Sequence, residues 1–247
     1  MEWIHITKIT VILPTINEEK GIGKTIDSIN REYFKKQGWT LEILIVDGDS
    51  KDKTCEIAKN KGAKIIIEKR KGYGRAYKTG MPKVTGEIIV TGDADATYPF
   101  ERIHQYIQLL LDKNLDFIST DRFAELKHGS MSVKHAFGNT ILALTLKILF
   151  FVNLRDSQSG MWIFRKQALT KIQPLENFND GMPFSEEIKI EMFKNKNVKT
   201  LEIPSELHPR EGEVKLESFK DGWRNLKFLF KKKNNKIIYF KASFLPL

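Results

Sequence analysis

Glu87-Ile-Ile-Val-Thr-Gly-Asp-Ala-Asp95 is a short apolar run that ends beside two carboxylates, Asp93 and Asp95. An apolar run of this kind predicts a buried strand, which places both carboxylates just beyond its carboxyl end. Mg²⁺ prefers oxygen ligands and is usually held by one or two carboxylates together with substrate phosphates. The pair therefore suggests an enzyme that handles a nucleoside diphosphate, although Asp-x-Asp also occurs in ordinary turns.

Strand-like and helix-like segments alternate on both sides of this stretch. Apolar, β-branched runs predict strands at 9–13, 41–46, 64–67, 88–90 and 116–119, with helices at 18–35, 52–61, 74–83 and 101–113. This alternation predicts an α/β protein with a parallel sheet covered by helices on both faces. Ligands bind outside the carboxyl ends of such strands, so the loops that follow them form one candidate site.

The second half of the chain is less regular, and no long linker separates it from the first. We expect a long apolar helix at 132–152, a strand at 162–164, a helix at 183–194, a strand at 198–203 that Pro204 ends, and a helix at 217–230.

Composition and charge narrow the class of protein. The chain has 247 residues, of which 41% are hydrophobic and 29% charged, enough for one α/β domain with a substantial core. The net charge of +10 indicates an anionic partner: nucleic acid, a phosphorylated substrate or a membrane surface. The basic residues are spread along the chain and no RNA-recognition or helix-turn-helix signature is present, so nucleic acid is not the partner we expect. The single cysteine, Cys55, excludes an internal disulfide and suits a reducing compartment.

The loops after the first three predicted strands are polar or rich in glycine. Pro14–Glu18 follows the first strand, Asp47–Ser50 the second, and a basic segment containing Gly72 and Gly74 the third. Capping of a helix explains Asn17 and Glu18 as well as ligand binding does. Asp47 and Asp49 would repel each other within one tight turn, which favours contact with a ligand. Gly23-Lys24-Thr25 is not a P-loop, because Glu18 stands where the earlier glycine would be, and the spacing of Gly72 and Gly74 does not match a dinucleotide-binding fingerprint.

Taken in order, these motifs resemble those of family 2 glycosyltransferases, in particular the branch that transfers a sugar to a polyprenyl (dolichyl) phosphate. The resemblance extends over about residues 8–230 and also includes Tyr98-Pro99, Asp121-Arg122-Phe123, Asn139, Asp156–Met161, Glu202–Pro204, Arg210–Gly212 and Lys215. It implies a GT-A fold with a mostly parallel central sheet, helices on both faces and an acceptor-side helical region. It also implies one catalytic domain at 1–230, with a nucleotide-sugar half at 1–120 and an acceptor half at 121–230, before a basic and apolar tail at 231–247.

The same resemblance implies an activity and a set of site residues. The expected reaction is the inverting transfer of a hexose from a UDP- or GDP-sugar to a polyprenyl phosphate, with Mg²⁺ or Mn²⁺ as cofactor. The implied nucleotide-binding residues are Pro14, Asn17, Glu18, Asp47, Asp49, Gly72 and Gly74, and the implied metal ligands are Asp93 and Asp95. The implied acceptor-phosphate residues are Arg122, Lys134 and His135, and the implied diphosphate cations are Arg210 and Lys215. A phosphate nucleophile is already anionic, which fits a chain with no obvious catalytic histidine.

The helix expected from Lys134 to Val152 carries more apolar residues than one core stripe needs. Such a helix could lie in a membrane interface and admit a prenyl chain, and a buried core helix fits the periodicity equally well. The basic run Lys231–Lys233 could add attachment to an anionic membrane. We therefore expect a membrane surface as a partner and a cytoplasmic location, peripheral at the cytoplasmic face.

Two departures and two alternatives stay open at this stage. Thr97 and Tyr98 stand where mannosyl-transferring relatives commonly carry Gln–His, and Trp162 stands where an arginine is common, so the donor sugar and its base are undetermined. A hydroxyl acceptor would require a carboxylate base, for which Asp156, Glu186 and Glu187 are available. A basic nucleic-acid-binding protein is the more remote alternative.

Overall fold

A computed structural model describes residues 8–126, 133–212 and 218–242, and within these residues seven strands form one sheet. The strands are β1 (Lys8–Thr15), β2 (Thr40–Asp47), β3 (Lys64–Ile67), β4 (Ile88–Thr91), β5 (Phe117–Leu126), β6 (Trp162–Arg165) and β7 (Thr200–Leu207). Their order across the sheet is β3-β2-β1-β4-β6-β5-β7. The pairings are parallel except for those of β6, which runs antiparallel to both β4 and β5. The expected α/β class with a mostly parallel sheet is confirmed.

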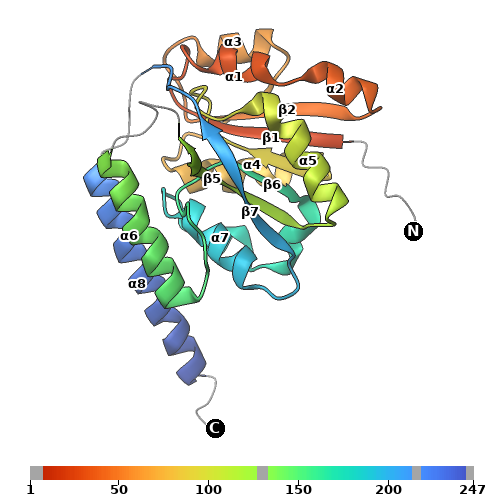
Figure 1. Cartoon of the computed structure of the whole chain (residues 1–247). Coiled ribbons are helices and arrows are strands. Elements are labelled where there is room, and N and C mark those ends of the chain that lie inside the picture. The colour runs from red at the N-terminus through yellow and green to blue at the C-terminus, as the bar shows by residue number, and fades with distance from the viewer. Residues whose placement is uncertain (1–7, 127–132, 213–217, 243–247) are drawn as a thin grey trace.

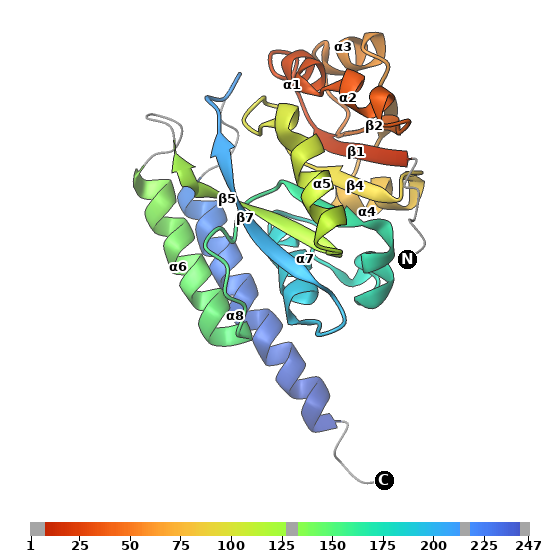
Figure 2. The same cartoon turned by 45° about the vertical axis from the view of Figure 1, so that its right-hand side comes forward.

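Helices cover both faces of the sheet and one end of the molecule (Figure 1). They are α1 (Ile22–Ser28), α2 (Arg31–Lys36), α3 (Thr54–Asn60), α4 (Tyr73–Gly80), α5 (Ile103–Asp112), α6 (Val133–Phe150), α7 (Phe184–Lys194) and α8 (Ser218–Ala242), with short 3₁₀ turns at 81–83, 100–102, 166–171 and 175–177. Helices α6 and α8 lie side by side along one end of the sheet in both views (Figures 1 and 2).

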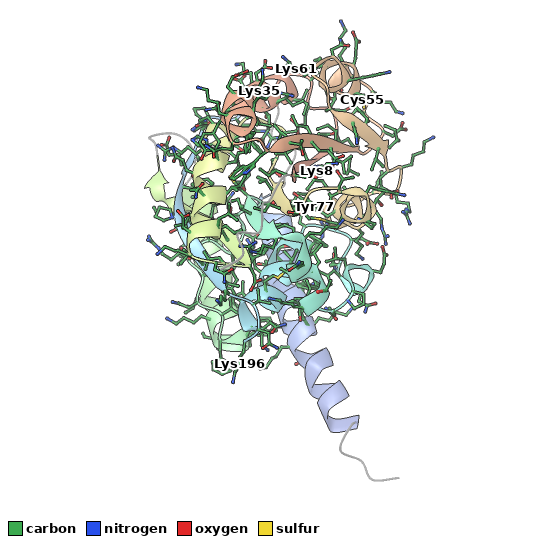
Figure 3. All side chains as sticks on the ribbon, turned by 90° about the vertical axis from the view of Figure 1, so that its right-hand side faces the viewer. Lys8, Lys35, Cys55, Lys61, Tyr77 and Lys196 are labelled. Carbon is green, nitrogen blue, oxygen red and sulfur yellow. The ribbon has the colours of Figure 1, made fainter. Side chains whose placement is uncertain are left out.

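Alternate residues of the strands face two separate cores, as expected for a sheet covered on both sides. Ile9, Val11 and Leu13 of β1 join the core beneath α1, α2, α3 and α5. Ile12 of the same strand joins the second core, beneath α4 and α7. Tyr77, labelled in the interior in Figure 3, is fully buried there and stacks on Phe184 with ring centroids 5.5 Å apart. A third cluster joins α6 and α8 to α7.

The topology brings the candidate loops to one edge of the sheet. The last residues of β1 and β2, Thr15 and Asp47, are paired, and Thr91 at the end of β4 pairs with Ile12. Because β6 runs in the opposite direction, its first residue lies at this same edge, and residues 156–161 before it approach the loop after β4. The one antiparallel strand therefore joins the second half of the chain to the site.

Two expected boundaries were wrong, each because of a local backbone effect. The single helix expected at 18–35 is two helices, since Ile29 is extended and Asn30 caps α2 by accepting a hydrogen bond of 3.0 Å from the backbone N–H of Tyr33. Strand β7 does not end at Pro204 but continues to Leu207. It is the edge strand of the sheet. Proline is tolerated there because an N–H on the open side of an edge strand has no neighbouring strand to bond.

Helix α8 continues well beyond residue 230, so the basic run Lys231–Lys233 is helical rather than a separate tail. Lys232 is buried and lies 2.7 Å from a carboxylate oxygen of Glu187 and 2.9 Å from one of Glu191. This lysine therefore fastens α8 to α7. Within the described ranges, no helix is both long and apolar enough to cross a bilayer.

Candidate functional site

A cavity of about 680 Å³ opens at the carboxyl ends of β1, β2, β3 and β4. Its wall contains seven of the residues singled out from the sequence, namely Pro14, Glu18, Asp49, Gly72, Asp93, Asp95 and Arg210. These residues come from five separate segments of the chain. The rule that places ligands at this edge of a parallel sheet therefore locates the cavity correctly.

Asp93 and Asp95 form the most acidic part of this cavity. Asp95 is almost fully buried, and its Oδ1 accepts hydrogen bonds from the backbone N–H of Thr97 (3.1 Å) and from the Thr97 hydroxyl (2.6 Å). Burial, followed by the neighbouring charge of Asp95, raises the pKa of Asp93 to about 7. Two carboxylates that oppose each other's ionisation in this way attract a cation.

Arg210 supplies that cation in the structure. Its Nη1 donates to Asp95 Oδ2 at 2.5 Å and its Nη2 donates to Glu18 Oε1 at 3.0 Å. The segment around it lies along the Asp95 loop, because the N–H of His208 donates to the Thr97 carbonyl (2.8 Å) and the N–H of Glu211 to the Asp95 carbonyl (2.9 Å). Arg210 is thus brought to the site from 115 residues away.

The opposite wall of the cavity is basic. Glu68 accepts hydrogen bonds from Arg70 at Nε (2.8 Å) and Nη2 (2.6 Å), and Arg70 lowers the pKa of Glu68 to about 2. Lys69, Arg70 and Lys71 all line this wall. Asp49 pairs with Lys51 at 2.6 Å, and this hydrogen bond lowers the pKa of Asp49. An anionic ligand is therefore favoured on this side.

Three of the residues expected to bind the nucleotide are not among those that line the cavity, and each has partners within the protein. Asp47 is fully buried and holds the turn after β2, accepting from the Thr15 hydroxyl (2.7 Å) and from the Ser50 backbone N–H (2.7 Å). Asn17 Oδ1 accepts from the backbone N–H of Lys51 at 2.8 Å, which joins the loops after β1 and β2. Gly74 gives room to the carbonyl of residue 179, which would lie 2.2 Å from an added Cβ.

Arg122, inside β5 where the strand register shifts after Asp121, is held by a buried carboxylate. Its Nε and Nη2 donate to the two oxygens of Asp156 at 2.6 and 2.9 Å, and its backbone N–H donates to Asp156 Oδ2 at 3.1 Å. Burial disfavours charge on Arg122, but Asp156 more than compensates and raises the pKa of the guanidinium. The charge of Arg122 in turn lowers the pKa of Asp93, although Arg122 is not among the residues that line the cavity. Lys215 lies outside the described residues, as do the side chains of Lys134 and His135.

Sequence reasoning missed the two tyrosines and the glycine that border Asp93. The N–H of Gly160 donates to the Tyr98 hydroxyl at 2.6 Å. An added Cβ at Gly160 would lie 2.8 Å from the Tyr73 hydroxyl and 3.5 Å from Asp93 Oδ1. Gly160 therefore allows the 156–161 loop to approach the acidic pair closely. The only sequence signal was that Tyr98 and Gly160 belong to motifs already noted for other reasons.

The three carboxylates considered as a possible base are all used elsewhere. Asp156 holds Arg122, and Glu187 is paired with Lys232. Glu186 is fully buried, its Oε1 accepts from Gln158 Nε2 at 2.5 Å, and burial raises its pKa to about 8. None of the three lines the cavity. Their positions do not favour a reaction in which one of them removes a proton from a hydroxyl acceptor.

Comparison with known proteins places this fold and site in a family. Residues 10–173 match the profile of Glycosyl transferase family 2, and the chain belongs to that family. The chain is 35% identical over 223 residues to the low-salt glycan biosynthesis hexosyltransferase Agl6 of Haloferax volcanii, covering 90% of this chain and 52% of that protein. The chain thus spans about half the length of that relative. It is 31% identical over 215 residues to the dolichyl-phosphate hexose transferase of the same organism, covering 87% of this chain and 89% of the relative.

Solved structures with low sequence identity share the fold. Glucosyl-3-phosphoglycerate synthase of Mycobacterium tuberculosis, crystallised with Mn²⁺, UDP and phosphoglyceric acid, superimposes with a TM-score of 0.71 at 20% identity, covering 92% of this chain and 78% of that one. Mannosyl-3-phosphoglycerate synthase of Rubrobacter xylanophilus gives a TM-score of 0.71 at 16% identity, covering 94% and 75% of the two chains. The expected GT-A fold is therefore confirmed.

Replacing Glu186 by glutamine should change how stability depends on pH. The folded state keeps this carboxyl neutral up to about pH 8, whereas the unfolded chain ionises it near its ordinary pKa of 4.5. Its stabilising contribution is therefore complete below about pH 4.5 and is lost as the pH rises through 8. Glutamine does not titrate, so only the wild type loses stability at this position as the pH rises. We therefore expect the free energy of unfolding of Glu186→Gln minus that of the wild type to increase steadily from pH 5 to pH 8, as measured by urea denaturation.

Lys189 nearby has the opposite dependence, since burial lowers its pKa to about 7, and its effect on stability begins only above about pH 7, outside most of the range compared. A constant difference between wild type and variant over this pH range would contradict the prediction.

Proposed function

We propose that the protein transfers a hexose from a nucleoside diphosphate sugar to the phosphate of a polyprenyl phosphate, with inversion at the anomeric carbon. The observation that carries this proposal is that one loop, residues 156–160, both holds a mostly buried arginine, Arg122, through Asp156 and approaches Asp93 at Gly160. A cavity with a basic wall and an acidic end fits a nucleoside diphosphate with a cation, and Arg122 fits a second phosphate. The 31% identity to a dolichyl-phosphate hexose transferase supports this acceptor.

The acidic pair fits a divalent cation. Asp93 and Asp95 offer hard oxygen donors, the kind that Mg²⁺ and Mn²⁺ take up. Among the described residues, no group of three or more His, Cys, Asp or Glu side chains is arranged to hold a metal on its own. Two carboxylates that leave other positions to substrate phosphates are the arrangement that Mg²⁺ usually has in phosphate-handling enzymes. When bound, the cation would offset the charge that develops on the leaving diphosphate.

The chain's own residues would then divide the work of the transfer. The acceptor phosphate oxygen forms a bond to the anomeric carbon as the bond from that carbon to the diphosphate oxygen breaks. The acceptor is already an anion, so no side chain has to take a proton from it. Arg122 would bind and orient the acceptor phosphate, while Arg210 would move from Asp95 towards the diphosphate.

An apolar stripe on α6 suggests how a lipid acceptor would reach the site. Its exposed large apolar side chains follow one another at intervals of four, three and four residues, the spacing of one helix face: Phe137, Ile141, Leu144 and Ile148, continued by the exposed Phe151 directly after the helix ends. Trp223 and Phe230 on α8 are also exposed, and Lys227 lies over the Trp223 ring at 5.4 Å. Apolar side chains beside exposed basic ones favour the interface of an anionic membrane. We propose that α6 and α8 rest on such a surface at its cytoplasmic face.

The reaction can be tested directly with purified protein. With Mn²⁺, a panel of UDP- and GDP-hexoses and a polyprenyl phosphate, we expect one donor to give a new lipid-linked hexose.

Asp93→Asn and Asp95→Asn should each lower kcat at least about a hundredfold, because a charge-stabilising group is lost at the reacting centre. Asp27→Asn, which changes an exposed carboxylate on α1, is the matched control and should leave kcat unchanged. Transfer to a plain hydroxyl acceptor without any transfer to a prenyl phosphate would contradict the proposal.

Binding of Mn²⁺ should respond to Arg210 in opposite ways with and without nucleotide. In the absence of nucleotide, Arg210 occupies Asp95 Oδ2, so we expect Arg210→Ala to bind Mn²⁺ several-fold more tightly than the wild type. With nucleoside diphosphate present, the same variant should bind the Mn²⁺ complex more weakly, because the diphosphate loses a cation. Electron paramagnetic resonance of free Mn²⁺ measures both affinities, and a change in the same direction in both would refute this exchange.

Membrane attachment can be measured by flotation with vesicles of phosphatidylcholine and phosphatidylglycerol. The double variant Leu144→Ser, Ile148→Ser removes two exposed side chains from the middle of the stripe and should lower the vesicle-bound fraction at least about tenfold. Ile67→Ser changes an exposed apolar side chain on β3, at the opposite edge of the sheet, and should float like the wild type. Equal flotation of all three proteins would argue against the proposed surface.

A further inference from the structure

Each of the helices α6 and α8 carries one buried asparagine that reaches the loop before β6. Asn139 of α6 is 5% exposed, and its Nδ2 donates to Asp156 Oδ1 at 3.0 Å while its Oδ1 accepts from the Ser157 hydroxyl at 2.9 Å. Asn225 of α8 is 3% exposed, and its Nδ2 donates to Gln158 Oε1 at 2.7 Å. Both amides thus point to the same three-residue segment, 156–158.

This segment is one contact away from the proposed acceptor cation. Asp156 Oδ1, which accepts from Asn139, also accepts from Nη2 of Arg122. The orientation of the Asp156 carboxylate sets the orientation of the guanidinium, because two parallel N–H···O contacts fix both planes. Asn139 therefore acts on Arg122 through Asp156, although it does not touch the arginine.

The same loop also reaches the acidic pair. Gly160 donates its N–H to the Tyr98 hydroxyl, and its carbonyl accepts from the Thr91 hydroxyl at 2.7 Å. Tyr98 and Thr91 flank the segment that carries Asp93 and Asp95. A shift of residues 156–160 would therefore change the position of Arg122 relative to Asp93.

The asparagines are unusual for the helices that carry them. A buried amide costs free energy unless it is hydrogen-bonded, and leucine would fill the same space without that requirement. The exposed apolar side chains of α6 and α8 lie on the surface, whereas the two amides are buried against residues 156–158. A role beyond packing of the helices is the simplest explanation for polar groups placed in this way.

We infer that Asn139 and Asn225 are positioning residues for the acceptor phosphate, so that the helices bearing the exposed apolar stripe are also part of the acceptor site. Asn139 holds the carboxylate that orients Arg122, and Asn225 holds the next turn of the same loop through Gln158. The inference rests on the proposed transfer to a prenyl phosphate, and it assigns the acceptor subsite a support from α6 and α8.

The test uses a short-chain, water-soluble prenyl phosphate, which separates the acceptor site from membrane attachment. We expect Asn139→Ala to raise the KM for this acceptor about tenfold, the effect of losing one hydrogen bond to a charged group. The kcat at saturating acceptor should stay within about twofold of the wild type, and the Kd of the donor nucleotide, measured by calorimetry, should not change. A variant that was merely less well folded would lose kcat and donor binding together.

Thr145→Ala is the matched control, because the Thr145 hydroxyl donates only within α6, to the carbonyl of Ile141 at 2.8 Å. Should Asn139→Ala fail to fold, the same measurement can be made with Asn225→Ala. We expect a smaller rise of about threefold in the acceptor KM, because Asn225 contacts Gln158 and not Asp156 itself. An acceptor KM in the asparagine variants equal to that of Thr145→Ala would overturn the inference. Absence of transfer to any prenyl phosphate by the wild type would instead remove the proposed function, so the two failures are distinguishable.

Discussion

The buried ion pair between Arg122 and Asp156 is the interaction around which the second half of the molecule is organised. Taking two charges out of water costs several kcal/mol for each ion, and their attraction offsets this only when the remaining polar atoms are also paired. Asp156 meets that condition with donors from β5, from α6 and from its own loop. The pair can exist only if these three elements occupy their observed positions, and so it ties the strand, the helix and the loop together.

The direction of β6 determines how the two halves of the site meet. A chain of purely parallel strands would bring only the segments after strands to the cavity edge. Since β6 enters the sheet from that edge, the segment before it, with Asp156 and Gly160, is delivered to the same place. Close approach then depends on Gly160, where a side chain would collide with the Tyr73 hydroxyl. The cavity and the loop that holds Arg122 are therefore neighbours for reasons of topology and of one small residue.

The sequence predicted the parts of the fold and site that depend on local pattern. Apolar β-branched runs such as Ile88–Val90 are buried on both faces, and the polar residues after them fall at one edge by the geometry of parallel strands. The break at Asn30 was not predicted, because a capping side chain inside a periodic pattern looks like any other polar position.

Contacts between distant residues also escaped prediction. No local pattern indicates that Arg210 meets Asp95 across 115 residues, or that Asn139 and Asn225 share one loop. For the same reason the sequence did not indicate that Asp47 holds the turn after β2 or that Asn17 joins the loops after β1 and β2.

Pro204 has a consequence for how molecules of this protein meet one another. It lies exposed on β7, the outermost strand at one edge of the sheet. An open edge strand is a template on which a second chain can add a strand, the first step of many aggregation processes. A neighbouring strand that approached β7 would find no N–H at this position, and its ladder of hydrogen bonds would be interrupted there. The residue that looked like the end of a strand thus protects the edge of the sheet against self-association.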